Sequence, residues 1–417
     1  MKDRHALFAL RLATSLLCST AAGLGQAPVS AQSITLLAGG DIEWSRATKG
    51  PAMFYDAFPS GPQRNILWPR EDGWIRVPYT ATDESRALLE QKLDTVLVTD
   101  QAHHLRAHKY AVEFETPLAA ARYPFERIGD ALRSADIAFA NLETPLSDDA
   151  RWSGAFRTPA AFADALAWAG VDVVATANNH ALDAEGEGLV DTIDHLRRAG
   201  VGHAGTGLDL EDARRPFVIE RNGIRVAFLA YAQFVNDGGS SFATPRQSGV
   251  VPLDPLLIRE DIARVRDQVD QVVVSFHWGI ENSQEVHPGM REFAHATIDA
   301  GADIILGHHP HVRRGVEVYG GKPIVYSMGN FIFGHNHDYW MDNILVRLTV
   351  TRQEAGSVGV SRIEILPIAG IGDALSQPFL LEGDEALTVL EDIRDRSAEF
   401  GTSVTIEDNV GVIDPGR

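Results

Sequence analysis

The chain has 417 residues, of which 45% are apolar and 23% charged, as is typical of a globular protein. It carries 37 Lys and Arg against 57 Asp and Glu, which gives a formal net charge of −20 at pH 7. Such an acidic surface repels phosphate backbones, so we expect no nucleic-acid partner. An anionic substrate would need a local cation, and a bound metal ion is one source of that charge.

Residues 1–31 are predicted to form a signal peptide for export. Lys2 and Arg4 give a basic start, Leu12 to Leu24 is mostly apolar or small, and Val29-Ser30-Ala31 has the small residues that a signal peptidase needs. The apolar stretch is too short to cross a bilayer as a settled helix, and no later stretch is long enough. We therefore expect a periplasmic, cell-surface-associated or secreted protein without a transmembrane helix in the mature chain. A cytosolic N-terminus that imitates a signal is the alternative.

Cys18 is the only cysteine, and it lies within the predicted signal. Cleavage after Ala31 would leave no disulfide and no thiolate ligand, so any metal ion would be held by nitrogen and oxygen donors. Lipid attachment at Cys18 is the alternative, but Leu17 is larger than the residue that lipoprotein signals place before the cysteine.

Residues 32–417 are predicted to form a single α/β domain. Short apolar runs that end in polar turns alternate with helical stretches, which favours a mixed sheet or a sandwich with helices outside. The core is predicted over 34–46 and 126–381, with an insertion over 47–125 and a C-terminal helix and polar tail over 382–417. Strands are predicted at 34–38, 136–140, 172–177, 224–231, 271–276, 303–306, 323–327, 343–350 and 361–367, and helices at 125–134, 162–169, 189–199 and 291–300.

Five polar clusters directly follow predicted strands. Ligand sites in α/β folds lie at the carboxyl ends of strands, so these clusters are expected to converge. A single aspartate or histidine at such a place is commonly a turn or structural residue, but five clusters in one chain point to a site. The clusters are Gly39-Gly40-Asp41, Asn141-Leu142-Glu143, Asn178-Asn179-His180, His277-Trp278-Gly279-Ile280-Glu281 and Gly307-His308-His309-Pro310-His311.

His309 and His311 give the sharpest signal for a metal ion. Residues two apart on an extended segment point the same way, and Pro310 stiffens the link between them. Imidazole with carboxylate and amide oxygen suits Mn, Fe, Zn or Co better than Ca. A carboxylate such as Glu143 can bridge two metal ions about 3.5–4 Å apart. A buried hydrogen-bonded polar network is the alternative.

The residues of these motifs and their order along the chain resemble those of the CapA-type capsule synthesis family of the calcineurin-like metallophosphatase superfamily. The resemblance covers most of residues 34–335 apart from the insertion. It implies a four-layer α-β-β-α sandwich, with two sheets face to face and helices outside. The matching segments are 40–42 with Arg46, 135–146, 177–183, 277–279 with Glu281, 307–312 and the closing motif Tyr326-Ser327-Met328-Gly329-Asn330-Phe331.

The resemblance also implies roles for individual residues, around two divalent transition metal ions (Mn, Fe or Zn). His180 would face the substrate, where it donates to the leaving oxygen or stabilises charge. Arg46 would hold an anionic substrate group, unless it forms a surface salt bridge. Glu281 would orient a ligand imidazole, and His308 is extra to the family pattern and is placed outside the site. The implied metal ligands are Asp41, Glu143 as the bridge, Asn179, His277, His309 and His311.

The first motif departs from the wider superfamily. That superfamily has Asp-x-His, whereas this chain has Asp41-Ile42-Glu43. One metal ion therefore loses a nitrogen ligand, which bears on the occupancy of its site. We hypothesise that Glu43 replaces the histidine, and an exposed glutamate without that role is the alternative.

Other histidines carry weaker signals. His103, His104 and His108 in the insertion fit a solvated helix face better than a second metal site. His335 and His337 are expected in a loop, and His287 and His295 are expected to be structural.

Two functions of different kinds follow. The first is a metal-dependent hydrolase, phosphoesterase-like, that acts on a phosphoester or a γ-glutamyl polymer in capsule synthesis or export. The second is a non-catalytic polymer-binding or assembly subunit. Either would work with an anionic capsule-type polymer or its synthase and export complex. A third function, a nucleotidase or a nucleotide cyclic phosphodiesterase, rests on superfamily analogy alone.

Overall fold

A computed structural model describes residues 32–44, 65–70, 73–78, 98–99, 105–106, 116–149, 156–236, 239–333, 342–369 and 377–416. All of these residues lie in one compact unit, Ala31–Arg417. No helix among these residues has both the length and the apolar character needed to cross a membrane.

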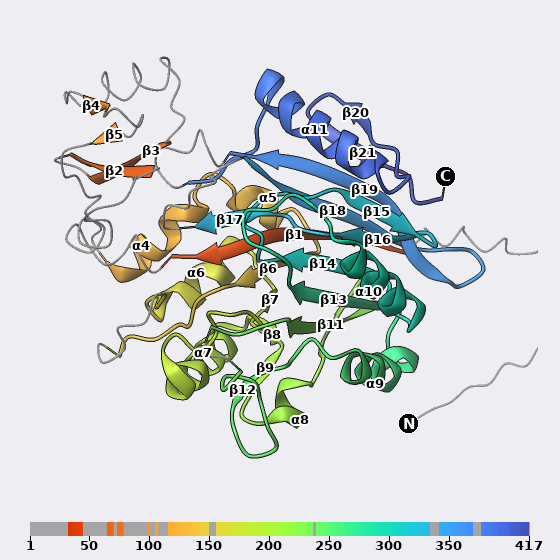
Figure 1. The fold of residues 1–417 in the computed structure, drawn as a ribbon, viewed down its shortest axis with the longest axis horizontal. Coiled ribbons are helices and arrows are strands. Elements are labelled where there is room, and N and C mark those ends of the chain that lie inside the picture. Colours follow the sequence, from red (N-terminus) through yellow and green to blue (C-terminus); the bar gives the residue numbers. More distant parts are fainter. Residues whose placement is uncertain are drawn as a thin grey trace, which may run out of the picture. The chain divides into compact units, whose positions relative to one another are not determined.

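The first large sheet combines parallel and antiparallel strands (Figure 1). Its order is β20 (Thr405–Glu407), β21 (Val410–Ile413), β19 (Val358–Ile368), β18 (Asn343–Arg352), β1 (Ser33–Glu43), β6 (Ile137–Leu142), β7 (Val173–Ala175) and β8 (Gly202–Ala204). β17 (Asn330–Phe333) also pairs with β1, in parallel. Strands β1, β6, β7 and β8 run parallel, so their carboxyl ends meet at one edge.

The second large sheet faces the first. Its order is β10 (Phe217–Arg221), β11 (Ile224–Ala232), β13 (Gln271–His277), β14 (Ile304–His308), β16 (Lys322–Val325) and β15 (Val316–Tyr319). Strands β11, β13, β14 and β16 are parallel. Three small pairs complete the described strands: β9 (Thr206–Gly207) with β12 (Gly249–Val250), β2 (Asn65–Arg70) with β3 (Gly73–Pro78), and β4 (Val98–Thr99) with β5 (Leu105–Arg106).

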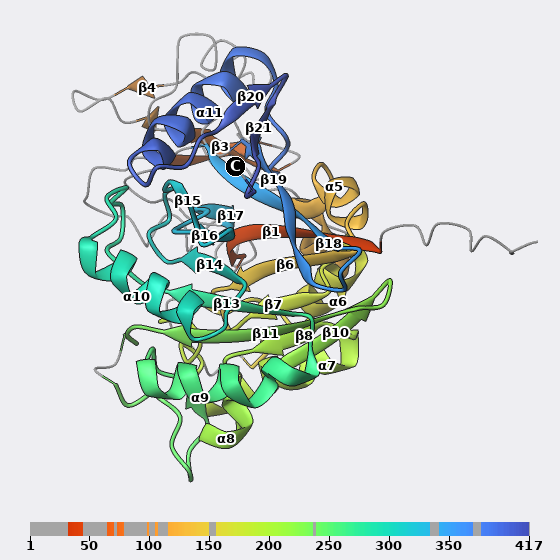
Figure 2. The same cartoon turned by 90° about the vertical axis from the view of Figure 1, so that its right-hand side faces the viewer.

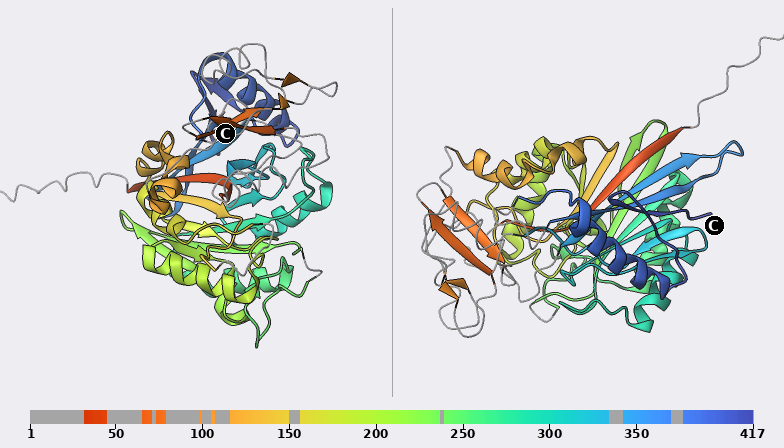
Figure 3. Two further views of the ribbon diagram at one scale, coloured as in Figure 1. Left: turned by 90° about the vertical axis from the view of Figure 1, so that its left-hand side faces the viewer. Right: turned by 90° about the horizontal axis from the view of Figure 1, so that it is seen from above.

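Helices cover the outer faces of both sheets (Figures 2 and 3). One apolar cluster joins the first sheet to α4 (Pro117–Arg122), η1 (Tyr123–Phe125), α5 (Gly129–Arg133), α6 (Ala161–Ala169) and α7 (Glu185–Ala199). Another joins the second sheet to α8 (Leu210–Ala213), α9 (Pro255–Val265) and α10 (Pro288–Asp299). The short η2 (Arg266–Gln268) follows α9, and α11 (Gly383–Ala398) packs on β19, β15 and β21.

The alternation of side chains along β1 explains the layers. Leu36 and Ala38 point into the core between the sheets, whereas Leu37 points to the helices outside. Across the middle layer, the rings of Phe139 and Phe228 stack with centroids 5.5 Å apart. Both faces of these strands are buried, which is why they read as nearly continuous apolar runs. The predicted four-layer α-β-β-α sandwich is confirmed.

Some elements differ from the predicted ones. Residues 117–125, predicted inside the insertion, form α4 and η1, and Ala121 and Phe125 are buried in the core. The predicted polar tail contains the hairpin β20–β21, which extends the first sheet beside β19. Helix α9 was not predicted, although Asp254 caps it and Pro255 opens it. The predicted helix ends at Gly170 and Gly200 are confirmed, with φ of 94° and 78°.

Candidate metal centre

The carboxyl ends of parallel strands from both sheets bring the predicted ligands together. Asp41 lies on β1, Glu143 directly follows β6, and Asn179 follows β7. His277 ends β13, and the loop after β14 carries the last two. All six ligands implied by the family resemblance are buried: Asp41, Glu143, Asn179, His277, His309 and His311.

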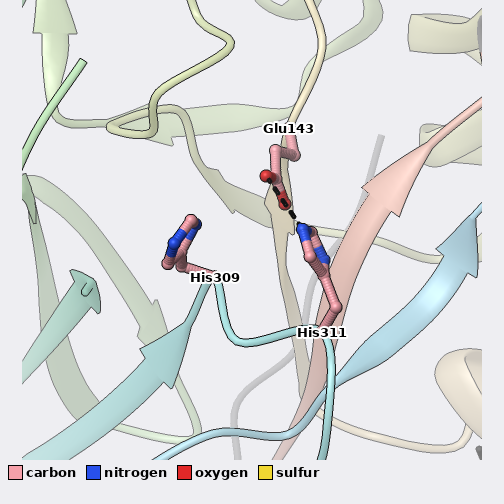
Figure 4. A group of neighbouring side chains, drawn as sticks. All are labelled: Glu143, His309 and His311. Atoms are coloured by element: carbon pink, nitrogen blue, oxygen red, sulfur yellow. Dashed lines mark ion pairs between the residues drawn. The ribbon is translucent and has the colours of Figure 1, made fainter. Parts of the chain in front are cut away.

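The side chains form two groups that share Glu143. Asp41, Glu143 and His277 make one group, and Glu143, His309 and His311 the other, and within each group the possible ligand atoms lie within 4.8 Å of one another. Figure 4 shows the carboxylate of Glu143 between the two imidazoles of the second group. A carboxylate common to two groups has the arrangement that a bridge between two ions requires.

Distances within the site are short. Oε1 of Glu143 lies 3.6 Å from Nε2 of His277 and 3.9 Å from Nε2 of His311. Oδ1 of Asn179 lies 2.7 Å from Nε2 of His277, so the Asn179 amide lies beside the group that contains His277. The amide is oriented in turn, because its Nδ2 donates to Oδ1 of Asn236 at 3.0 Å.

Burial dominates the electrostatics of the site. Burial, together with the negative charge of Asp41, raises the pKa of Glu143 well above its usual range. Burial would also raise the pKa of Asp41, but hydrogen bonds from His308 and His311 hold it well below its usual range. Burial and the neighbouring imidazoles lower the pKa of His277, and they lower that of His309 to about 3. His277 and His309 are therefore neutral at pH 7, which is the form that binds metal ions.

The donor set fits a transition-metal centre. Among the described residues, both carboxylate oxygens of Glu143 and Nδ1 of His309 are buried and accept no hydrogen bond. Buried polar atoms normally have partners, so a cluster of acceptors without them fits the binding of a cation. With imidazole, carboxylate and amide donors and no thiolate, the set suits Mn, Fe or Zn.

His308 lies in the site, contrary to our expectation. It is buried at the end of β14, and its Nδ1–H donates to Oδ1 of Asp41 at 3.2 Å. Asp41 also accepts hydrogen bonds from Nδ2 of Asn141 at 2.9 Å and from the backbone N–H of His309 at 3.2 Å, and its Oδ2 lies 3.4 Å from Nδ1 of His311. The family pattern gave no reason to include His308, but its position at the end of a central strand was a usable signal.

The loop of His309 and His311 differs from the extended segment that we predicted. Both histidines have positive φ, of 93° and 58°. The alternation expected of a strand therefore does not apply, and the imidazoles reach Glu143 through a left-handed turn instead. Backbone strain of this kind is concentrated at functional sites.

His180 lies beside the centre and belongs to neither group. Its Nδ1–H donates to Oδ2 of Asp183 at 2.8 Å, and the ring of Phe156 packs against it with centroids 4.0 Å apart. The backbone N–H of His180 donates to Oδ1 of Asn178 at 3.2 Å, which fixes the turn after β7. The Phe156 ring and the turn after β7 together hold the His180 imidazole in one orientation.

The remaining candidates have mixed outcomes. Glu43 is buried rather than exposed, but it belongs to neither group of possible ligands. Glu281 is exposed, and its charge adds to the effect of burial in raising the pKa of Glu143; a hydrogen bond from it to a ligand imidazole is not found among the described residues, so its orienting role stays a prediction. His287 caps α10, and His295 pairs with Glu317, which confirms their structural roles. Arg46, His103, His104, His108, His335 and His337 lie outside the described residues.

Several curated relatives are named for PGA, capsule or polyglutamine synthesis. The chain is 31% identical to the PGA biosynthesis protein CapA of Bacillus subtilis over 289 residues, covering 68% of this chain and 74% of that protein. It is 33% identical to the capsule biosynthesis protein CapA of Bacillus anthracis over 236 residues, covering 54% and 57%. A probable polyglutamine synthesis accessory protein of Mycobacterium tuberculosis is 32% identical over 253 residues, covering 56% and 66%.

Solved structures show more distant likenesses. The sulfate thiohydrolase SoxB of Thermus thermophilus aligns with a TM-score of 0.38 at 15% identity, covering 79% of this chain and 55% of that one. Purple acid phosphatase PPD1 of yellow lupin aligns with a TM-score of 0.24 at 12% identity, covering 52% and 49%. Likenesses at this level transfer neither a substrate nor an activity.

A family model gives the assignment. Residues 88–335, more than half of the chain, match the model of the bacterial capsule synthesis protein PGA_cap. The match contains Glu143, Asn179, His277, His309 and His311. The chain belongs to this bacterial capsule synthesis family.

Proposed function

We propose that this protein is an exported, metal-dependent hydrolase that acts on a phosphoester or γ-glutamyl bond of a capsule-type anionic polymer. The observation that carries the proposal is the pair of ligand groups sharing Glu143, with His180 beside them. The relatives named for PGA and capsule biosynthesis support the polymer. The sequence of residues 1–31 supports export to the periplasm, the cell surface or the medium.

Six of the residues would bind metal ions, and His180 would transfer a proton. Asp41, Asn179 and His277 would hold one ion, His309 and His311 the other, and Glu143 both. Bound ions supply Lewis-acid polarisation and a water molecule activated near neutral pH. In the doubly protonated form of His180, Asp183 would accept the Nδ1–H, and the proton on Nε2 would be the one donated to the leaving group.

Aromatic rings pack against two of the candidate ligand imidazoles. Phe234 packs edge-on against His309 with centroids 4.5 Å apart, and Phe333 packs against His311 with centroids 4.8 Å apart. These rings limit the directions in which the imidazoles turn and exclude water around them. Both effects favour a preorganised site over one that forms only on binding.

Elemental analysis of the purified protein tests the centre. We expect about two Mn, Fe or Zn ions per chain in the wild type, as a shared bridge requires, and fewer in His309→Ala. The control is His195→Ala, on α7 and outside the site, which should bind as many ions as the wild type. The wild type, loaded with each metal, is then given phosphodiester and γ-glutamyl substrates.

The outcomes separate the two candidate functions. Hydrolysis that disappears in His180→Ala while metal content stays constant supports the hydrolase. Two bound ions without turnover of any substrate overturn the hydrolase and favour a polymer-binding or assembly subunit. In that case, binding of poly-γ-glutamate should survive His180→Ala.

A further inference from the structure

The closing motif of the family resemblance has no role in the proposed chemistry. Its residues 326–330, here called the crossover segment, connect β16 of the second sheet to β17 of the first. Because the metal ligands come from both sheets, a segment that joins the sheets beside the site is placed to hold those ligands in register.

Backbone hydrogen bonds attach the crossover segment to several loops of the site. The carbonyl of Gly329 accepts the N–H of Asp41 at 3.0 Å, and the N–H of Met328 donates to the carbonyl of Gly307 at 3.3 Å. The carbonyl of Tyr326 accepts Nε1–H of Trp278 at 3.2 Å, next to His277. The segment therefore contacts the carboxyl ends of β1 and β14 and the loop after β13.

Side chains of the segment reach the histidine loop as well. Oγ of Ser327 donates to the carbonyl of Val312 at 2.7 Å. Oδ1 of Asn330 lies 2.9 Å from Nδ1 of His311, closer to it than Oδ2 of Asp41, which lies at 3.4 Å. An amide oxygen only accepts, so Nδ1 of His311 carries the hydrogen and Nε2 keeps its lone pair. Nε2 is also the atom that faces Glu143, at 3.9 Å.

The position of Asn330 is set by its own surroundings. It pairs directly with Asp41 in the parallel register of β17 and β1. Nδ2 of Asn343 donates to its backbone carbonyl at 3.2 Å. The preceding Gly329 has φ of 73°, and a Cβ there would lie 2.1 Å from Oδ1 of Asn343, so no larger residue fits. The backbone therefore holds the side-chain amide of Asn330 in one orientation toward His311.

We propose that Asn330 is a positioning residue, which fixes the tautomer and ring orientation of His311 so that Nε2 is the metal-binding nitrogen. Histidine ligands commonly donate their second N–H to such an acceptor, and its loss weakens metal binding by about 10–100-fold. The inference rests on the proposed metal centre but not on the proposed reaction.

The test compares Zn²⁺ binding to wild type, Asn330→Leu and Asn330→Asp, measured by competition with a chelating dye. Leucine is similar in size and accepts no hydrogen bond, so the weaker-bound ion should be held about 10–100-fold less tightly. Aspartate keeps an acceptor and should restore binding. The control is Asn409→Leu, which removes an asparagine that also accepts one hydrogen bond, from the N–H of Gly383, far from the site.

Nitrogen NMR of the Zn²⁺-loaded protein distinguishes positioning from general stabilisation. We expect His311, assigned by comparison with His311→Ala, to carry its hydrogen on Nδ1 in the wild type and in Asn330→Asp but not in Asn330→Leu. A hydrogen on Nε2 in the wild type overturns the proposal, as does unchanged Zn²⁺ affinity in a folded Asn330→Leu. Normal Zn²⁺ binding without hydrolysis would instead count against the proposed function alone.

Discussion

Oε1 of Glu143 lies 3.6 Å from Nε2 of His277, although Glu143 follows a strand of one sheet and His277 ends a strand of the other. The candidate metal centre therefore lies where the carboxyl ends of β6 and β13 face each other across the sandwich. Neither sheet alone carries the complete set of ligands. The burial that creates the centre also removes water from its charged groups, and several consequences can be measured.

Glu143→Gln should reduce the metal content and stabilise the metal-free fold at pH 7. Folding raises the pKa of Glu143, so its favourable contribution is present below the ordinary pKa of about 4.3 and is lost as the pH rises through the folded value. We compare the free energies of unfolding of the metal-free variant and the metal-free wild type at two pH values. Their difference should favour the variant by about 1–3 kcal/mol more at pH 7.5 than at pH 4.5. Urea unfolding at both pH values measures this. Glu292→Gln, an exposed control, should follow the wild type.

His309→Gln should make the metal-free protein less sensitive to acid. Burial lowers the pKa of His309 to about 3, against about 6.5 in the unfolded chain. The favourable contribution of His309 to the free energy of unfolding is therefore present above pH 6.5 and is lost as the pH falls. The loss at pH 4 is on the order of 3 kcal/mol. Urea unfolding between pH 7 and 4 should show a shallower decline in the variant. Curves for the wild type and the variant that fall in parallel would contradict the prediction.

His180→Ala should lower kcat by about 10²–10⁴-fold while metal content stays unchanged, because a proton donor outside the ligand groups is removed. Asp183→Asn should also lower kcat, since an amide can donate to Nδ1 and so stabilise the wrong tautomer. Steady-state kinetics with parallel elemental analysis measures both variants. Loss of metal in either variant would show that the residue acts on the ligands instead.

Phe139→Ala should destabilise the protein by about 3–5 kcal/mol, because its buried ring stacks on Phe228 between the two sheets. Leu256→Ala, at a side chain that is 60% exposed, should change the free energy of unfolding by less than about 0.5 kcal/mol. Denaturant unfolding of both variants makes the comparison. Equal effects would mean that the core between the sheets is not packed as described.

Gly40→Ala should disturb both the fold and the metal centre. A Cβ at Gly40 would lie 1.7 Å from the carbonyl oxygen of Gly329, so β1 and the crossover segment must separate. We expect a loss of about 1–3 kcal/mol in stability and weaker metal binding through Asp41. Gly359→Ala is the matched control, since nothing lies within 4 Å of its added Cβ. Wild-type metal affinity in a folded Gly40→Ala would contradict the prediction.

Local patterns predicted the core elements of the fold. Burial on both faces makes β1, β6 and β13 nearly continuous apolar runs, and Gly170 and Gly200 stop their helices because glycine adopts positive φ without strain. Patterns of this kind involve neighbouring residues, so they can be read from the chain itself. The hairpin β20–β21 was missed because its short strands gain their stability from pairing with β19, far away in the sequence.

The kinds of metal-binding residue were likewise readable in the sequence, because donor chemistry belongs to the residue types and their motifs. The residues that these side chains contact could not be predicted from the sequence. His308 was set aside, and only the folded chain places its Nδ1 beside Asp41, 267 residues earlier. The same holds for Asn330 and His311, whose contact depends on the passage of the chain from one sheet to the other. The sequence by itself determined which atoms can bind metal. The tertiary structure decided which of them lie close together, because packing two sheets face to face brings distant segments into contact and excludes water from the space between them.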